Sequence, residues 1–183
     1  MPKIVAERTE WVRYGFELFA RHGASALIVD KMARKLTCNR SSFYWHFNSK
    51  EKFIDEIIKY WVEFDTDQII NQVEKASTPD KKFKVFIATT FKSDPYIDFI
   101  FHLKRYAIKR KDIQTMIDKI NKQRIDFVSS LLVDLGYSET ESMEKASIFY
   151  KYLIGHHEMI KYKKQPKNHI EDIYQELKHF IDL

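Results

Sequence analysis

The chain has 183 residues, of which 31 are Lys or Arg and 26 are Asp or Glu, giving a formal net charge of +5. Four glycines and four prolines are few for this length, which can bury a substantial core, so the composition favours an all-α fold. The one cysteine, Cys38, excludes an intramolecular disulfide and suits a reducing cytoplasm. No apolar run approaches the roughly 20 residues of a membrane span, so we expect no membrane partner.

The positive charge is concentrated near the N-terminus. Residues 1–50 contain nine Lys or Arg and four Asp or Glu, a surplus equal to that of the whole chain, so residues 51–183 are formally neutral. A basic segment of this kind predicts a polyanionic partner such as double-stranded DNA. We therefore expect a head at residues 1–50 and a larger helical body at residues 51–183.

Apolar residues at helical spacing predict the elements in chain order. A first helix ends before Gly23, where a glycine can adopt the left-handed conformation. A short helix over 29–36, a tight turn and a third helix from Asn39 follow, and this is helix-turn-helix spacing. Further helices are predicted at 50–76, 79–92, 95–110, 112–135, 139–163 and 166–181.

The segment from Asn39 to Lys50 concentrates groups that can contact DNA. Hydroxyls, an arginine, aromatics and a lysine gather around a helix start, where unpaired backbone N–H groups and the positive dipole end favour phosphate. Arg40 is the candidate base reader, because a guanidinium can donate two hydrogen bonds to guanine. Phe43 and Phe47 fall on the inward spacing and are assigned to the core. The predicted DNA-binding residues are Asn39, Arg40, Ser41, Ser42, Tyr44, Trp45, His46 and Lys50.

The order of residues in this region resembles the tetracycline-repressor (TetR) family of bacterial transcription regulators. The resemblance spans about residues 11–58. It is carried by Phe19, Gly23, Met32-Ala33, the turn at 36–38 and the run Tyr44-Trp45-His46-Phe47-Asn48-Ser49-Lys50. It implies a helix-turn-helix head, a ligand-binding and dimeric helical body, and phosphate contacts from Tyr44 and Lys50.

Several positions depart from the family pattern. Ile28 replaces a threonine and cannot cap the second helix, and Thr37 replaces the turn glycine, which costs energy if its φ is positive. Asp30 stands where members carry a basic or polar residue, so it would repel DNA unless it reads a cytosine amino group. Cys38 is expected to fill a small apolar slot where relatives have valine, rather than to act as a redox switch.

The body carries aromatic residues at helical spacing, and most of them are expected to be core. Polar groups within these stripes are more informative, because a buried polar group needs a partner and a bound ligand is one candidate. We predict an apolar or aromatic small-molecule effector. The candidate pocket residues are Trp61, Phe99, His102, Tyr106, Phe127 and Tyr150.

A dimer interface is predicted near the C-terminus. Gly155 lies inside a predicted helix, where it costs about 1 kcal/mol relative to alanine unless another helix approaches its backbone. With the amphipathic last helix, it predicts a four-helix interface between two copies that includes Gly155, Ile173, Leu177 and Ile181. The alternative is that both stripes form the body's own core.

Neither enzymatic nor metal chemistry is indicated. The sequence has no glycine-rich phosphate loop or nucleophile elbow, and the adjacent His156 and His157 would point to different helix faces, so we expect no cofactor and no metal. The leading hypothesis is a ligand-responsive regulator, a repressor that binds a palindromic operator as a homodimer and is released by its effector. The alternative is a helical small-molecule or metal carrier without a DNA-binding role.

Overall fold

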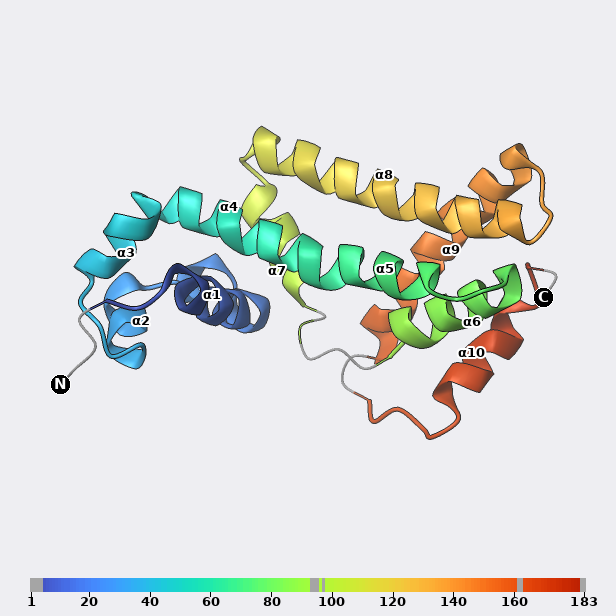
Figure 1. Cartoon of the computed structure of the whole chain (residues 1–183), viewed down its shortest axis with the longest axis horizontal. Coiled ribbons are helices and arrows are strands. Elements are labelled where there is room, and N and C mark those ends of the chain that lie inside the picture. Colours follow the sequence, from blue (N-terminus) through green and yellow to red (C-terminus); the bar gives the residue numbers. More distant parts are fainter. Residues whose placement is uncertain (1–4, 93–95, 97, 161–162, 182–183) are drawn as a thin grey trace. The chain divides into compact units, whose positions relative to one another are not determined.

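The computed structural model describes residues 5–92, 96, 98–160 and 163–181, and it confirms the predicted all-α fold (Figure 1). The α-helices are α1 (Arg8–His22), α2 (Val29–Lys35), α3 (Ser41–Phe47), α4 (Lys50–Trp61), α5 (Gln68–Glu74), α6 (Pro79–Thr90), α7 (Phe99–Ala107), α8 (Lys111–Asp134), α9 (Glu139–Ile160) and α10 (His169–Leu177). A 3-10 helix, η1 (Ala24–Ala26), follows α1. A π-helix, η2 (Val62–Asp67), connects α4 to α5, so the long helix predicted over 50–76 contains a π segment.

The chain divides into two compact units. The first unit comprises Met1–Asp65 and Pro95–Thr115, and the second comprises Thr66–Asp94 and Met116–Leu183. The first unit extends beyond the predicted head because α4 and α7 both pack against α1. A functional boundary at residue 50 stays a prediction.

The core of the first unit is aromatic, with a glycine where two of its helices meet. Trp11 and Phe19 of α1 and Phe53 of α4 are fully buried. Gly15 lies where α1 meets α4: a Cβ atom there would be 2.4 Å from Phe53 Cζ and 2.8 Å from Ile57 Cδ1. A side chain at this position would therefore require the ends of the Phe53 and Ile57 side chains to shift.

The core of the second unit is formed by residues of α5, α6, α8, α9 and α10 and the segment after α10. Its buried members are Val73, Phe83, Phe86, Ile87, Phe91, Val128, Leu131, Leu132, Ala146, Phe149, Ile173, Leu177 and Ile181. Ile173, Leu177 and Ile181, which were predicted for the dimer interface, are 1%, 0% and 0% exposed. The apolar face of α10 is thus used inside the chain, and these three side chains are not available to a partner.

Several helix boundaries differ from the predictions. The last helix was expected from Pro166 but begins at His169, because a turn precedes it in which the His169 N–H donates to the Pro166 carbonyl (3.2 Å). α9 ends at Ile160, before the predicted Lys163, and residues 161–162 lie outside the described residues. The predicted helix start at Pro95 also lies outside the described residues.

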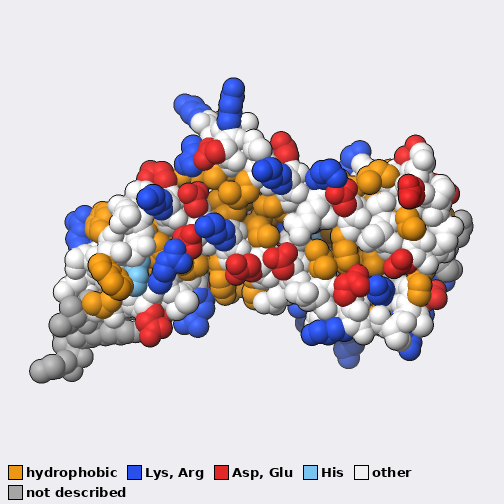
Figure 2. All heavy atoms as spheres, turned by 45° about the horizontal axis from the view of Figure 1, so that its top comes forward, with side chains coloured by type: hydrophobic (Ala, Val, Ile, Leu, Met, Phe, Trp, Pro, Cys, Tyr) orange, Lys and Arg blue, Asp and Glu red, His pale blue; other side chains and the backbone are white. Residues whose placement is uncertain are grey.

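The surface mixes charged and apolar side chains. On the face in Figure 2, Lys and Arg side chains are interspersed with Asp and Glu, and hydrophobic side chains show between them. The most exposed large apolar residues are Trp45 (76%), Met159 (74%) and Ile108 (69%). Within the described part of the chain, no helix combines the length and apolar character that crossing a membrane requires.

Candidate nucleic-acid interface

α2, a turn and α3 form the predicted helix-turn-helix. The turn requires a left-handed residue, and Thr37 supplies it with φ of +52°. The backbone closes the turn because the Cys38 N–H donates to the Ala33 carbonyl (3.0 Å), and the Thr37 hydroxyl donates to the Leu36 carbonyl (2.8 Å). The replacement of glycine therefore keeps the turn, at a conformational cost of about 1–2 kcal/mol. At the start of α2, Ile28 provides no side-chain cap, as expected.

α3 begins at Ser41, two residues later than predicted. Arg40 occupies the N-cap position, and no side chain caps the helix. The Asn39 carbonyl accepts the Ser42 N–H (3.0 Å), so Asn39 contributes through its backbone. The side chains of Asn39 and Ser41 remain exposed.

Two of the predicted DNA-binding residues face the interior of the first unit. Ser42 is 3% exposed, and its hydroxyl donates to the Ala6 carbonyl (3.2 Å) while accepting the Ala6 N–H (3.2 Å) and the Trp11 indole N–H (3.3 Å). His46 Nε2 lies 2.8 Å from the same Ala6 carbonyl. Ser42 and His46 therefore hold the segment before α1 against α3, and we remove Ser42 from the proposed DNA-contacting set. In the sequence, the position of Ser42 directly before the inward-facing Phe43 indicated that its side chain could face the interior.

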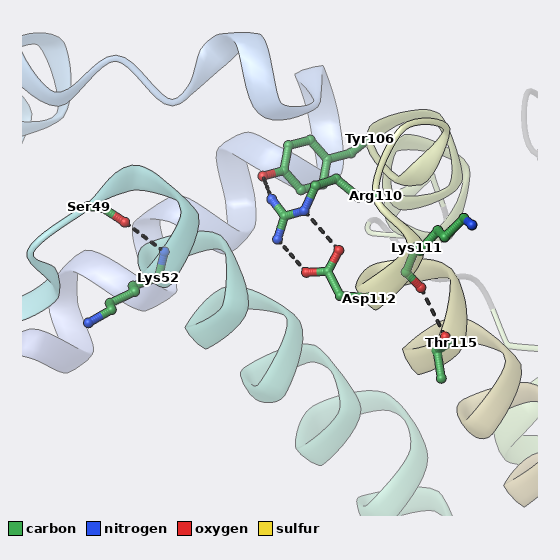
Figure 3. Close-up of polar contacts among 7 residues, drawn as sticks. All are labelled: Ser49, Lys52, Tyr106, Arg110, Lys111, Asp112 and Thr115. Atoms are coloured by element: carbon green, nitrogen blue, oxygen red, sulfur yellow. Dashed lines mark hydrogen bonds and ion pairs between the residues drawn. The ribbon is translucent and has the colours of Figure 1, made fainter.

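The outward face of α3 is open. Trp45 is 76% exposed and Tyr44 is 42% exposed, whereas Phe43 and Phe47 are buried as predicted (1% and 2%). Lys50 begins α4 and is partly exposed. At this helix start the Ser49 hydroxyl accepts the Lys52 N–H (3.2 Å; Figure 3), which satisfies one of the free N–H groups of the first turn.

Arg40 is held by two neighbours. Its Nη2 donates to the Tyr44 hydroxyl (3.2 Å), its Cζ lies 5.5 Å from the Tyr44 ring centroid, and its Nη1 lies 3.5 Å from Asp30 Oδ1. The Tyr44 hydrogen bond, followed by the Asp30 carboxylate, raises the pKa of Arg40 above its ordinary value. Sequence reasoning treated Asp30 only as a charge facing DNA and missed this pair, which joins α2 to the start of α3.

Trp61 and Phe99, two of the predicted pocket residues, are core residues of the first unit. Their rings stack with centroids 4.8 Å apart, and the Phe99 ring also lies 4.9 Å from that of Phe19. Phe99 is 0% exposed and Trp61 is 4% exposed. His102 is partly buried against Gly23, where a Cβ atom would be 3.0 Å from His102 Nδ1. Gly23 has a positive φ of +73°, as predicted after a helix, but its ψ of −173° places it outside the left-handed helical conformation.

Tyr106 belongs to a charged cluster at the junction between α7 and α8 (Figure 3). Arg110 donates to the Tyr106 hydroxyl (2.9 Å) and makes two hydrogen bonds to Asp112, at 2.9 and 2.6 Å. The Arg110 hydrogen bond lowers the pKa of Asp112 to about 2, whereas burial raises the pKa of Asp55. A two-pronged Arg–carboxylate pair fixes the α7–α8 corner. In the sequence, the spacing of Arg110 and Asp112, two residues apart, could have indicated this pair.

The other two predicted pocket residues, Phe127 and Tyr150, belong to the second unit. Phe127 is half-buried with its ring 6.0 Å from that of Phe86. Tyr150 is 6% exposed and donates its hydroxyl to Asn121 Oδ1 (2.8 Å). Arg124 donates to the buried Thr66 hydroxyl at 2.8 and 3.1 Å. The polar groups of Tyr150 and Arg124 thus have partners in the chain itself.

Gly155 faces open space on α9. A Cβ atom built there meets nothing within 4 Å, and the residue is exposed. Large apolar side chains on the same helix are also exposed, namely Ile148 (55%), Ile154 (38%) and Met159 (74%). The described part of the chain therefore gives no packing reason for this glycine or for the apolar surface around it.

The adjacent histidines of α9 lie beside a third histidine of α10. The ring centroid of His156 is 5.2 Å from those of both His169 and Phe91. His157 Nε2 and His169 Nε2 lie 2.8 and 3.2 Å from carbonyl oxygens at the C-terminal end of α6. Burial, with the neighbouring histidines, lowers the pKa of His156. Among the described residues, no three His, Cys, Asp or Glu side chains are placed to hold a metal ion.

Residues 13–57 match the family model described as bacterial regulatory proteins, tetR family. This segment contains α2, the strained turn and the open face of α3. The head of the chain, over residues 13–57, is a TetR-family helix-turn-helix head. A comparison with curated proteins finds no match.

Solved structures share the fold over the whole chain. A transcriptional regulator from Saccharomonospora viridis in complex with choline is 14% identical, with a TM-score of 0.79 over 96% of this chain and 95% of that one. A TetR transcriptional regulator from Legionella pneumophila is 17% identical, with a TM-score of 0.73 over 97% of both chains. A cysteine mutant of the TetR-family regulator CifR, bound to 26-bp operator DNA, is 13% identical, with a TM-score of 0.74 over 98% of this chain and 99% of that one. These likenesses show that the chain shares the fold of these three solved structures over nearly its whole length.

Proposed function

We propose that this TetR-family regulator is a repressor that binds a palindromic operator as a homodimer and releases it when a small molecule binds. The observation that carries the DNA-binding part is the open face of α3. The Trp45 indole is 76% exposed on the second helix of a helix-turn-helix, next to a phenol and a guanidinium, and its described ring contact is with the adjacent His46, at 4.6 Å between centroids. Aromatic and arginine side chains on such a helix can contact base edges in the major groove.

Arg40 and Lys50 have different roles in this proposal. Arg40 reads a guanine through a pair of N–H donors, whereas Lys50 contacts a phosphate through a single ammonium at the start of α4. Loss of Arg40 should therefore remove discrimination at one base pair, and loss of Lys50 should weaken binding to all duplexes alike. Tyr44 and Trp45 complete the surface with backbone and groove contacts.

The test measures binding of the full chain by fluorescence anisotropy, using a duplex selected from a random pool and a scrambled duplex. Arg40→Ala should lower discrimination at one base pair by about 5- to 140-fold, which corresponds to about 1–3 kcal/mol. Lys50→Ala should reduce the slope of log affinity against log salt by about 0.9. Equal effects of both variants on both duplexes would contradict the assignment of Arg40.

The homodimer is proposed through the exposed face of α9. Gly155, Ile148 and Met159 lie on one side of this helix, because residues 148, 155 and 159 are spaced by seven and four. Small and apolar residues together suit close packing of two helices, and a symmetric dimer would place both copies of this face in contact. Gly155→Leu should yield helical monomers in sedimentation. An unchanged dimer would place the interface elsewhere.

The effector is proposed to be an apolar or aromatic molecule. The side chains of His102 and Tyr106 in the first unit and of Phe127 in the second are only partly buried, whereas the other three candidates are core residues. An anionic ligand would need buried cationic partners to offset its desolvation. Apolar burial at roughly 25 cal/mol per Å² can reach micromolar affinity without such partners.

A further inference from the structure

Asp30 is the residue of the helix-turn-helix that the DNA-binding role leaves unexplained. A carboxylate on a surface meant for DNA should weaken binding, since it repels phosphate. The side chain is 57% exposed, so burial does not account for it. Its described charge partner is Arg40, whose Nη1 lies 3.5 Å from Asp30 Oδ1.

The two contacts of Arg40 come from different directions. Tyr44 follows one turn later on α3 and accepts the Nη2 hydrogen bond at 3.2 Å, while Asp30 faces the opposite nitrogen, Nη1, from α2. The Tyr44 ring also lies beside the guanidinium, with 5.5 Å between Cζ and the ring centroid. An exposed arginine otherwise samples many rotamers, so two such contacts reduce the freedom that it must lose on binding.

We propose that Asp30 is a positioning residue that directs the Arg40 guanidinium toward a single guanine and at the same time reduces non-specific attachment to phosphate. This inference rests on the proposed DNA-binding function. The guanidinium has five N–H groups, of which one is donated to Tyr44 and one faces Asp30, so a pair stays free for guanine O6 and N7. The carboxylate also offsets part of the positive charge that would attract any duplex.

Removing the Asp30 carboxylate should lower base discrimination and raise affinity for random DNA, and these opposite effects make the role testable. When Asp30 is changed to Asn, Arg40 loses its fixed direction and discrimination at its base pair should fall by about 1.5- to 5-fold, the range expected for one exposed ion pair. Affinity for random DNA should rise, because a negative charge is removed from the surface. A defect in folding would instead lower binding to both kinds of DNA.

The experiment uses the full chain and the duplex selected from a random pool, with single-base substitutions at each position. Asp30→Asn should flatten the profile at the base pair that Arg40→Ala identifies, and Asp30→Glu should restore part of the discrimination. In the Arg40→Ala background, Asp30→Asn should no longer change the profile. It should still raise affinity for random DNA.

Two results would overturn the inference. An unchanged profile in Asp30→Asn would show that Arg40 needs no positioning partner. A profile change that persists in the Arg40→Ala background would show that Asp30 itself touches a base, such as a cytosine amino group. Failure of the proposed function is distinguishable, because the wild-type chain would then select no DNA sequence and all variants would behave like it.

Discussion

Gly15→Ala tests the packing that supports the DNA-facing helix. The added Cβ would lie 2.4 Å from Phe53 Cζ and 2.8 Å from Ile57 Cδ1, whereas carbon atoms in contact prefer about 3.5–4.0 Å. The tip of the Phe53 ring must therefore move by roughly 1 Å. That ring packs against Phe43 and Phe47 of α3, with centroids 5.0 and 4.7 Å apart, so the displacement reaches the recognition helix.

The expected loss is the difference between two terms. Overpacking a core costs about 1–3 kcal/mol, and alanine in place of glycine inside a helix returns about 1 kcal/mol. We expect Gly15→Ala to lower the free energy of unfolding by up to about 2 kcal/mol, measured by urea denaturation followed through tryptophan fluorescence.

A second substitution separates the clash from other effects. Phe53→Leu removes the ring atoms that the new methyl would meet, so the double variant should lose about 1 kcal/mol less than the two single variants together. If Gly15→Ala stabilised the protein, as the same change does at an open position in a helix, the proposed clash with Phe53 would be wrong. Strict additivity with Phe53→Leu would refute it as well.

Three further predictions concern the turn, the histidines and the effector. Thr37→Gly should stabilise the fold by about 0.5–1 kcal/mol in urea denaturation, because φ of +52° suits glycine better; a loss of stability would contradict this. The pKa of His156 lies below its ordinary 6.5, so the unfolded chain binds the proton more readily and stability should fall as the pH drops from about 6.5 through the folded-state pKa. His156→Phe should reduce the difference in urea midpoint between pH 7.5 and 5.5, and an unchanged difference would assign the effect elsewhere. In thermal-shift screening, hydrophobic aromatics should stabilise the protein, His102→Ala or Tyr106→Ala should reduce that shift without loss of DNA binding, and stabilisation by sugars or phosphates alone would contradict the effector class.

The helices and the helix-turn-helix could be predicted because their signals are local. Apolar spacing assigned Phe43 and Phe47 to the core, and Gly23 marked the end of α1. Thr37 stands where the TetR family pattern has a turn glycine, and its φ is still positive. The family pattern therefore predicted the backbone conformation of this position although the residue type differs.

Long-range packing could not be predicted in the same way. The apolar residues of α10 around Leu177 would show the same spacing whether they packed against a partner or against their own chain. In the structure they pack against their own chain. Trp61 and Phe99 likewise show helical spacing, but their rings stack because α4 and α7, which are far apart in the sequence, pack together. The Asp30–Arg40 pair was missed because charge was counted by segment rather than paired across the turn.

The measurement that tests the central claim most directly is the affinity of the purified full chain for the DNA that flanks its own gene. Fluorescence anisotropy at physiological salt would compare this DNA with a scrambled duplex of equal length. The account predicts a palindromic site, with half-sites about one helical turn or a multiple of it apart, that binds at least about 10³-fold more tightly than the scrambled duplex. Equal affinity for both duplexes, or binding that does not weaken as salt rises, would contradict it.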